Sequence, residues 1–237
     1  MKNILISGGT GGIGSAISKK FLSEGFKVYS LDLCDKDLGE DFHNIVCDVT
    51  SIEDLRKVKD SLKDIKFAHI ITLAGRALED EWKDFQDIDI ESIGKSIDLN
   101  LSAHLYVIRT FLDMLDEKDN HKSIILMSSI NAYGGFGLPI YSSAKAGLVA
   151  FSKSVHPHLT KLGVRVNTIC PGTIVTEATL TEPKNFEELL KTTKLGRFMT
   201  KEEVADLTYK LCELSNETGK VVNIDAGQNE VVNGRNN

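Results

Sequence analysis

The sequence predicts one α/β domain built on a doubly wound parallel sheet of about seven strands. Short apolar or β-branched runs alternate with helical patterns along the whole chain of 237 residues. This alternation is typical of a parallel sheet covered by helices on both faces. A glycine-rich turn follows the first run, and no linker, repeat or low-complexity stretch divides the sequence. A chain of this length can bury one large core, so we expect a single domain over residues 1–237.

The expected strands are short apolar or β-branched runs, which suit strands buried on both faces of a parallel sheet. In chain order they are 3–7, 27–31, 44–47, 68–73, 123–128, 164–169 and 221–224. The last ten residues, 228–237, are polar, and we expect them to form a loose tail.

Helical patterns fill most of the gaps between these runs. The first pattern places Ile13, Ile17 and Phe21 on one face and ends at Gly25, a residue that favours a helix C-cap. The second begins with a Thr-Ser pair followed by acidic residues, as helix N-termini do. Pro157 predicts a kink in the fourth pattern, because proline removes a helical hydrogen bond. The five expected helical segments are 13–25, 50–64, 97–117, 143–162 and 201–214.

Composition and charge exclude several classes of protein. The chain is 41% hydrophobic and 26% charged, which is ordinary for a soluble globular protein. No run approaches the ~18 apolar residues that span a bilayer. A net charge of −6 without a basic block argues against nucleic acid or an anionic membrane as the main partner. The N-terminus lacks a secretory signal pattern, so we expect a cytoplasmic protein.

Cysteines and histidines do not predict a metal site. The four cysteines are widely spaced and form no CxxC pair, which favours reduced, partly buried thiols over disulfides or metal ligands. Among the six histidines only His156 and His158 are close in sequence, on either side of a proline. A pair on a helix surface beside a proline kink is the plainer interpretation, and we expect no bound metal.

The turn after the first strand has the spacing of a dinucleotide site. Gly9, Gly11 and Gly14 fit the pattern G-x-G-x-x-G, and Gly8, Gly12 and Gly14 fit the related G-x-x-x-G-x-G. Glycines let the backbone turn sharply and approach a pyrophosphate, which then lies at the helix N-terminus. The alternative is a turn that binds nothing, but five glycines in seven residues would then cost backbone entropy without a visible gain.

Asp32 ends the second strand, 18 residues after Gly14. A carboxylate at this place can accept hydrogen bonds from both ribose hydroxyls of an adenosine, and it would repel a 2′-phosphate. Thr10 and Gly11 occupy the glycine turn, where an Arg or Lys would be needed to hold such a phosphate. The pattern therefore favours NAD(H) over NADP(H); a solvated loop acid is the alternative.

Tyr141 and Lys145 are four residues apart and would share one face of a helix. The glycine turn and this pair stand together with "LMSS" before the tyrosine and "CPGTIVT" after it. The combination resembles the short-chain dehydrogenase/reductase family, over about residues 3–228. Further matches are "DLN" (98–100), "LGRFMTKEEVA" (195–205) and "TGKVVNIDAG" (218–227). The resemblance implies a Rossmann-type domain, a nicotinamide cofactor, and dimers or tetramers paired through the helices at 97–117 and 143–162.

The resemblance also implies roles for individual residues. The catalytic tetrad would be Asn100, Ser129, Tyr141 and Lys145. The cofactor would contact, in chain order, Gly8, Thr10, Gly12, Ile13, Gly14, Asp32, Asp48, Val49, Ala74, Gly75, Tyr141, Lys145, Pro171, Gly172, Ile174 and Thr176. In the family, the positions from Gly8 to Gly14 lie on the phosphate side and Asp32 binds the adenosine ribose. Asp48 and Val49 match contacts to adenine, and Ala74 and Gly75 match the turn beneath that ribose. Lys145 and the positions from Pro171 to Thr176 match contacts at the nicotinamide end. Taken alone, Asp48 would be an ordinary loop acid.

Two departures from the family pattern concern the site. Thr72 and Leu73 replace the usual Asn-Asn or Asn-Ser before the Ala-Gly turn, which removes side-chain hydrogen bonds at a sheet junction. Ser129 lies 12 residues before Tyr141, one fewer than is common, so the intervening loop is short. Ser128 is a substitute for Ser129 only if strand alternation does not send it to the other face.

In the expected mechanism, Tyr141 moves a proton while the cofactor moves a hydride. A free tyrosine has a pKa of about 10, and a cation one helical turn away would lower it, which is the role expected of Lys145. Tyr141 would accept the alcohol proton in oxidation or donate it in reduction. Ser129 would stabilise charge on the substrate oxygen, and Asn100 would hold a water that links Lys145 to solvent.

The substrate is less defined by the sequence. Residues 177–197 occupy the position of the family's substrate loop and are polar and mixed in charge, while residues 78–91 form an acidic stretch. The acidic stretch is either a solvated approach to the next helix or, if it lines the entrance, a feature that disfavours a highly anionic substrate. We expect a small or medium polar alcohol or ketone. The alternatives are a 3-oxoacyl-thioester (acyl carrier protein) reductase and, from another class, a non-catalytic NAD-binding regulator.

Overall fold

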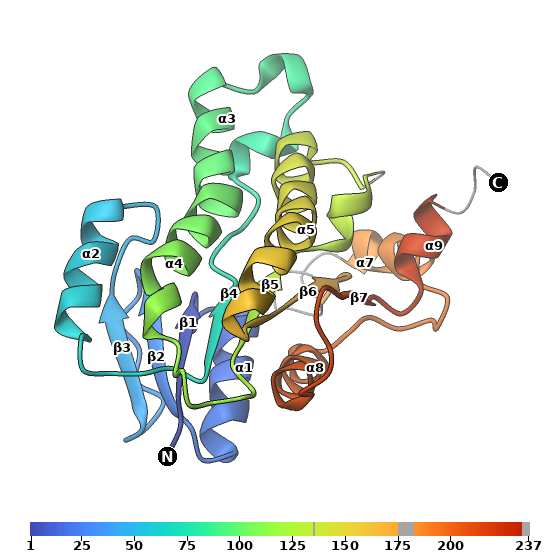
Figure 1. The fold of residues 1–237 in the computed structure, drawn as a ribbon. Helices are drawn as coiled ribbons and strands as arrows, with labels where there is room; N and C mark the ends of the chain where they lie inside the picture. Colours follow the sequence, from blue (N-terminus) through green and yellow to red (C-terminus); the bar gives the residue numbers. More distant parts are fainter. Residues whose placement is uncertain (135, 175–182, 234–237) are drawn as a thin grey trace.

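The computed structural model describes residues 1–134, 136–174 and 183–233. Within them, seven parallel strands form one sheet with the order β3-β2-β1-β4-β5-β6-β7 (Figure 1). The predicted doubly wound sheet is therefore confirmed. The strands are β1 Asn3–Ser7, β2 Lys27–Asp32, β3 Phe42–Val46, β4 His69–Thr72, β5 Ser123–Met127, β6 Arg165–Pro171 and β7 Val221–Ile224.

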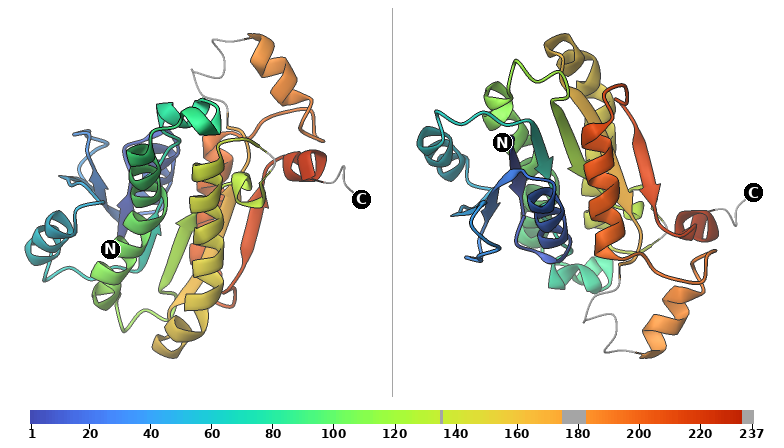
Figure 2. Two further views of the ribbon diagram at one scale, coloured as in Figure 1. Left: turned by 90° about the horizontal axis from the view of Figure 1, so that it is seen from above. Right: turned by 90° about the horizontal axis from the view of Figure 1, so that it is seen from below.

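Helices cover both faces of this sheet. Figure 2 shows α4 and α5 on one face and α1 and α8 on the opposite face. The α-helices are α1 Gly12–Ser23, α2 Ile52–Ser61, α3 Ile90–Ile97, α4 Ala103–Phe111, α5 Pro139–Leu159, α7 Pro183–Leu190, α8 Lys201–Glu213 and α9 Gln228–Asn233. Short 3₁₀ or π segments are η1 Glu79–Trp82, η2 Phe85–Asp87, η3 Asp98–Ser102, η4 Leu112–Met114, η5 Ile130–Tyr133 and η6 Thr160–Leu162.

Two hydrophobic cores lie on the two faces of the sheet. Successive strand residues point to opposite faces, so Leu5 joins one core and its neighbours Ile4 and Ile6 join the other. The first core packs against α2, α4 and α5, for example through Phe111. The second packs against α1 and α8, for example through Phe21. The sheet is thereby buried on both sides, as its continuous apolar runs predict.

Two local expectations differ from the structure. Gln228 begins helix α9 and is 2% exposed, so residues 228–233 are not a loose tail. The amide of Gln228 is held by Thr173 and Thr192, which accounts for its burial. The expected helix over 97–117 is divided by the π segment η3. Helix α5 runs through Pro157 and ends two residues later at Leu159, so the proline removes a backbone donor from the last turn of the helix.

Candidate active site

The glycine turn joins β1 to α1 in a backbone shape that admits no side chains at two positions. Gly8 has φ of +82°, and a Cβ there would lie 2.8 Å from the backbone of Ala74. A Cβ on Gly14 would lie 1.8 Å from the carbonyl oxygen of Gly8. Gly12, by contrast, has no described atom within 4 Å of the place a Cβ would take. The turn is thus closed on the protein side and open on the other.

A cavity of about 1120 Å³ lies on the open side of this turn. It is formed at the carboxyl ends of the strands, where β1 separates β2 from β4 and the winding of the sheet reverses. Ligands of doubly wound sheets bind at such a switch point. The predicted cofactor residues that line it are Gly8, Thr10, Gly12, Ile13, Gly14, Asp32, Asp48, Val49, Ala74, Gly75 and Ile174. Among the described residues, no side chain caps the N-terminus of α1, which leaves its N–H groups for an anion.

Asp32 is fixed at the end of β2 by backbone donors. Its Oδ2 accepts a hydrogen bond from Thr10 N at 3.1 Å, and its Oδ1 accepts one from Leu33 N at 2.8 Å. The carboxylate is therefore oriented before any ligand arrives. A cation that the sequence analysis missed lies beside it: Lys36 Nζ donates to Thr10 O at 3.3 Å. Lys36 comes from the connection after β2 rather than from the glycine turn.

Asp48 and Val49 lie after β3 on the wall of the same cavity. Asp48 Oδ1 accepts hydrogen bonds from Thr50 N at 2.9 Å and from Thr50 Oγ1 at 2.7 Å. This short-range turn explains why an acid occurs here without any ligand. The Asp48 side chain is thus both a turn residue and a cavity residue.

Asn100 lies in the π segment η3 and is fully buried. Its Nδ2 donates to Arg76 O at 2.9 Å and to Ser96 O at 3.1 Å. Its Oδ1 has no hydrogen-bond partner among the described residues. A buried acceptor without a partner is costly, so this oxygen points to a water or ligand group that would complete the site. A π turn at a functional residue is a common association.

Helix α5 brings Tyr141 and Lys145 together one turn apart. Lys145 Nζ lies 5.5 Å from the centre of the Tyr141 ring and donates to Met127 O at 3.1 Å. A Cβ on Gly75 would lie 2.7 Å from Asn100 Oδ1 and 3.4 Å from Lys145 Nζ. Because Gly75 also lines the cavity, both polar groups lie behind one of its wall residues, although Asn100, Ser129, Tyr141 and Lys145 are not themselves among the residues that line it.

The two serines after β5 point in different directions. Ser128 Oγ donates to the backbone carbonyl of Lys145 at 2.8 Å, so its hydroxyl is hydrogen-bonded to the backbone of helix α5. Ser129 Oγ bonds Asn131 Oδ1 at 3.1 Å and accepts from Asn131 N at the same distance. Ser129 also bonds the Tyr141 side chain. Ser128 therefore does not replace Ser129, in agreement with strand alternation.

The pKa values of the tyrosine and the lysine are shifted by burial. Loss of water raises the pKa of Tyr141 to about 12, against a hydrogen bond from Ser129 that lowers it. Burial lowers the pKa of Lys145 to about 7. The expectation that Lys145 depresses the tyrosine pKa is wrong for the ligand-free chain, because desolvation is the larger effect on both groups. Tyr141 is consequently protonated at neutral pH.

The segment after β6 is described in part. Pro171 ends β6, and Gly172 N donates to Ile224 O at 2.9 Å. A Cβ on Gly172 would lie 2.8 Å from Asp225, so this position is closed by the strand end. Ile174 lines the cavity. Thr176, and the first six residues of the expected substrate loop at 177–197, lie outside the described residues.

The junction at Thr72 and Leu73 keeps its backbone pairing. Leu73 N donates to Ser7 O at 3.1 Å, so β1 and β4 stay joined without the family's asparagines. Thr72 Oγ1 is buried and has no hydrogen-bond partner among the described residues. His104 of α4 is buried near this junction and beside Lys145, and burial lowers its pKa well below the usual range. The departure thus leaves neutral side chains behind the site.

Three further charged residues were not singled out by sequence reasoning. Arg76 and Lys201 line the cavity together with Lys36. The acidic stretch at 78–91 contains Glu81, which is 2% exposed and bonds Tyr141 N. Sequence spacing could not reveal Arg76, Lys201 and Glu81, because they come from separate parts of the chain: the segment after β4, the start of α8 and η1. Lys36 alone had a local signal, since it lies four residues after Asp32.

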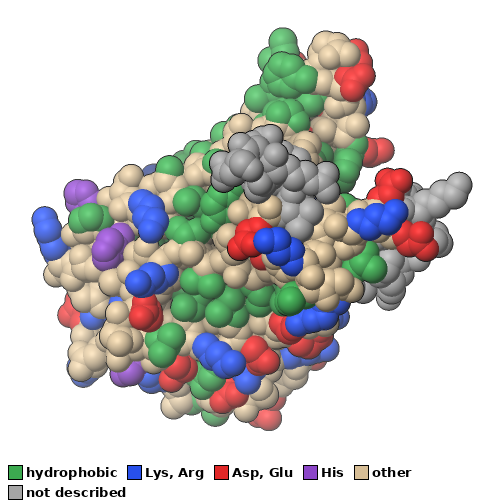
Figure 3. All heavy atoms as spheres, turned by 90° about the vertical axis from the view of Figure 1, so that its right-hand side faces the viewer, with side chains coloured by type: hydrophobic (Ala, Val, Ile, Leu, Met, Phe, Trp, Pro, Cys, Tyr) green, Lys and Arg blue, Asp and Glu red, His purple; other side chains and the backbone are tan. Residues whose placement is uncertain are grey.

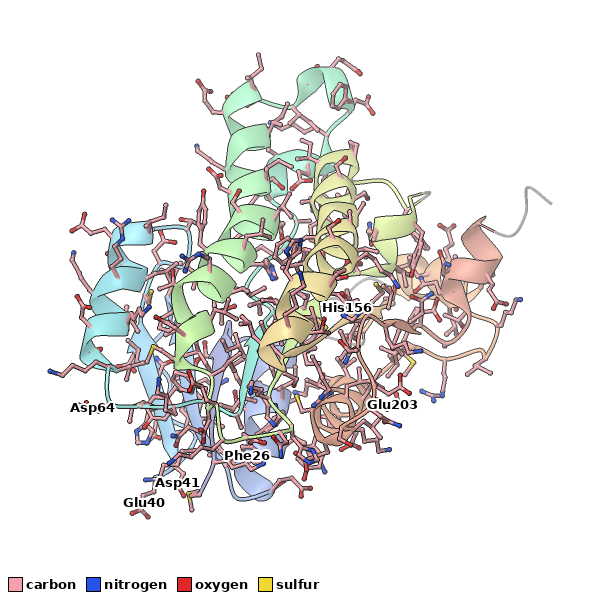
Figure 4. The ribbon with its side chains drawn as sticks, viewed as in Figure 1. Phe26, Glu40, Asp41, Asp64, His156 and Glu203 are labelled. Carbon is pink, nitrogen blue, oxygen red and sulfur yellow. The ribbon has the colours of Figure 1, made fainter. Side chains whose placement is uncertain are left out.

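The described residues contain no group of three or more His, Cys, Asp or Glu placed to hold a metal ion. His156, near the end of α5 in Figure 4, has its Nδ1 3.2 Å from Thr218 Oγ1. No described helix is long and apolar enough to cross a membrane.

The chain is similar to known proteins over most of its length. The short chain dehydrogenase family model matches residues 2–185. A probable galactose dehydrogenase of Rhizobium meliloti is 31% identical over 188 residues, covering 74% of this chain and 73% of the relative. An acetoacetyl-CoA reductase of Synechocystis is 30% identical over 210 residues, covering 86% and 85%. The crystal structure of a short chain dehydrogenase family protein from Francisella tularensis has a TM-score of 0.86 and 28% identity, covering 96% and 98%.

Proposed function

The chain belongs to the short-chain dehydrogenase family of NAD(P)-dependent oxidoreductases, and we propose that it interconverts a secondary alcohol and a ketone on a small or medium polar substrate, with NAD(H) as cofactor. One observation carries the proposal. Tyr141 and the buried Lys145 lie one helical turn apart, and Lys145 Nζ and Asn100 Oδ1 both lie beside Gly75, a wall residue of a cavity bounded by a glycine turn. A proton-transfer group beside a dinucleotide cavity suits hydride chemistry.

The residues present fit a nicotinamide dinucleotide. The open side of the glycine turn and the uncapped N-terminus of α1 would hold the pyrophosphate. Asp32, already oriented by backbone N–H groups, would accept the ribose hydroxyls. Lys145 would bind the second ribose, and the unpaired Asn100 Oδ1 would hold a water beside it. The bound cofactor would supply or accept the hydride.

The protein moves the proton. Since the pKa of Tyr141 is raised to about 12, its phenol is a proton donor at neutral pH, which suits reduction of a ketone. Ser129, bonded to the Tyr141 side chain, would donate a hydrogen bond to the same substrate oxygen. In oxidation, Tyr141 must first release its proton, and Lys145 with the Asn100 water would carry that proton to solvent.

The choice between NAD(H) and NADP(H) depends on two side chains at the ribose end of the cavity. Asp32 favours NAD(H) because a carboxylate repels a 2′-phosphate. Lys36, whose Nζ is 3.3 Å from Thr10 O, brings the opposite charge to the same place. We expect Asp32→Asn to raise kcat/KM with NADP(H) and Lys36→Met to lower it. A wild-type enzyme that uses only NADP(H) would overturn the preference.

A 3-oxoacyl-thioester reductase is the second candidate. It is favoured by the relative named as an acetoacetyl-CoA reductase and by the three cations that line the cavity, Lys36, Arg76 and Lys201. Such an enzyme would work mainly with NADPH. A substrate panel that contains polyols, sugars, hydroxy acids and acetoacetyl-CoA, run with both cofactors, separates the two candidates.

The test of catalysis is Tyr141→Phe. We expect turnover to fall by roughly 10²- to 10⁴-fold, because a general acid is lost, while NADH binding, measured by fluorescence, stays intact. Tyr209→Phe on α8, which lies on the other face of the sheet, is the matched control and should keep full activity. Retained turnover in Tyr141→Phe would refute the assignment. NADH binding without any turnover in wild type would favour the non-catalytic regulator.

We also propose that the chain forms a dimer or tetramer through α4 and α5. Several apolar side chains of these helices are only partly buried, among them Leu105, Tyr106 and Phe151. Hydrophobic side chains also gather on the projecting part that contains α3 (Figure 3), where Trp82 and Ile90 are exposed. Light scattering that finds a particle of 26.1 kDa, the mass of one chain, would contradict this proposal.

A further inference from the structure

The helix that carries Tyr141 and Lys145 has an unusual N-terminus. The first N–H groups of any α-helix lack intrahelical partners and need acceptors from outside. Leu138, which precedes α5, has φ of 52° and offers no side-chain acceptor, and Pro139 has no N–H. The N–H of Tyr141 donates instead to Glu81 Oε2 at 2.7 Å. The cap of this helix therefore comes from η1, 60 residues earlier in the chain.

Glu81 is a buried carboxylate with partners on both oxygens. Glu81 is only 2% exposed, and acidic residues are seldom buried to this extent unless they are paired. Oε1 accepts from Ser96 Oγ at 2.6 Å and from Leu78 N at 3.2 Å. A negative charge is also favoured at a helix N-terminus. These interactions offset the cost of removing the carboxylate from water.

The other carboxylate oxygen of Glu81, Oε1, is connected through Ser96 to Asn100, another member of the expected tetrad. Ser96 of α3 donates to Glu81 and accepts from Asn100 Nδ2, at 3.3 Å through its Oγ and at 3.1 Å through its carbonyl oxygen. One unbroken set of hydrogen bonds thus runs from the backbone of Tyr141 through Glu81 and Ser96 to the side chain of Asn100. It joins two residues that the rest of the fold supplies from separate helices.

We propose that Glu81 is a positioning residue of the active site: its carboxylate caps the helix of Tyr141 and Lys145 and, through Ser96, holds Asn100 in register with them. The inference rests on the proposed function, because it concerns the alignment of the proton-transfer groups. It also changes the interpretation of the acidic stretch at 78–91. Glu79 is exposed to water, but Glu81 points inward and does not face the substrate.

The charge of Glu81 provides a readout that a purely structural cap would not have. Glu81 raises the pKa of Tyr141, since a nearby negative charge disfavours the phenolate. Other ionisable or charged groups occur on α5 and on the described elements packed against it. They are Lys145, Lys153, His156 and His158 of α5, Arg165 and Cys170 of β6, Tyr133 of η5, Glu79 and Asp80 of η1, Lys161 of η6, and the exposed Glu91, Lys95 and Asp98 of α3 and η3. Glu81 is the buried carboxylate among these groups, so its removal should be felt at Tyr141.

The experiment compares Glu81→Gln and Glu81→Ala with the control Glu79→Gln, which removes the same charge from the exposed face of η1. Glutamine keeps an acceptor for Tyr141 N but loses the charge. In Glu81→Gln the pH profile of kcat/KM for alcohol oxidation should move to lower pH by about half a unit or more. In Glu81→Ala kcat should fall roughly 10- to 100-fold, with the dissociation constant of NADH unchanged. Glu79→Gln should match wild type in each measurement.

Two further variants keep the proposal falsifiable. If Glu81→Ala does not fold, Ser96→Ala replaces it: this change cuts the path to Asn100 and should lower kcat while the pH profile stays in place. An unmoved profile in Glu81→Gln, or unchanged kcat in the folded Glu81→Ala or Ser96→Ala variant, would overturn the proposal. Tyr141→Phe is assayed in parallel. An active Tyr141→Phe rejects the proposed function itself, whereas an inactive one with an unmoved Glu81→Gln profile rejects only the role of Glu81.

Discussion

Replacing Lys145 with methionine should remove a pH dependence of stability that the ligand-free wild-type chain possesses. Burial lowers the pKa of the Lys145 ammonium group from 10.5 to about 7 in the folded chain. A lowered lysine pKa destabilises the folded state at low pH, because the unfolded chain binds a proton that the folded chain binds less readily. This penalty is complete below the folded pKa and disappears as the pH rises through 10.5. The free energy of unfolding should therefore rise with pH in this window.

The magnitude follows from the two pKa values. One proton difference between the unfolded and folded chains changes the unfolding free energy by about 1.4 kcal/mol per pH unit. From about pH 8 to about pH 9.5 nearly the whole proton is bound in the unfolded chain only, so wild type should gain about 2 kcal/mol relative to Lys145→Met. Urea unfolding of both proteins, followed by circular dichroism at several pH values, measures this difference. Titrations common to both proteins cancel.

The control is Lys153→Met, which removes an exposed lysine from the same helix. The Lys153 ammonium donates to Gly219 O and stays in contact with water, so this variant removes a lysine from α5 without removing a buried charge. If the curves for wild type and Lys145→Met run parallel between about pH 8 and about pH 9.5, Lys145 is not desolvated and the reasoning is refuted.

Gly14→Ala should cost several kcal/mol of stability, since its methyl group would lie 1.8 Å from Gly8 O. Gly12→Ala should fold normally but lose NADH affinity. Urea denaturation measures the first effect and titration with NADH the second. Gly94→Ala should raise the unfolding free energy by roughly 0.5–1 kcal/mol, as α3 has open space there; a lower denaturation midpoint would contradict this. Arg165→Met should cost about 3 kcal/mol in urea unfolding, because the guanidinium donates to four backbone carbonyls; an unchanged midpoint would show that water replaces it.

Much of the fold follows from patterns that are local in the sequence. The strand runs predict the strands to within about two residues, because strands buried on both faces are mostly apolar, as Ser123–Met127 is after its first residue. The cap of α2 is equally local, since Ser51 Oγ accepts from Asp54 N. By contrast, the π segment at Asp98–Ser102 has no sequence signal, because its residues suit an α-helix equally well.

The candidate site likewise contains residues whose positions the sequence predicts and residues that it does not. The positions of Asp32 and of the Tyr141–Lys145 pair can be predicted, because Asp32 ends the strand that follows the glycine turn and its helix, and the pair is spaced within one helix. Glu81 could not be found, since its partner Tyr141 is 60 residues away and its neighbours are ordinary surface acids. The pKa directions were also beyond the sequence: spacing places a cation one turn from the phenol, but only the packed structure shows how far both groups are removed from water.

The π segment affects the phase of the sequence along the continuous helical stretch from Ile90 to Phe111. A π turn holds one residue more than an α turn, so Asp98–Ser102 acts as a single-residue insertion between α3 and α4. Deleting one residue from it would restore a uniform α-helix and leave α3 and α4 close to their present phase, because the π turn is what absorbs the extra residue. Asn100 would then lose either Ser96 or Gly75 as a neighbour. The extra residue therefore places Asn100 rather than either flanking helix, and a one-residue deletion within Asp98–Ser102 should affect the candidate site more than the packing of α3 and α4.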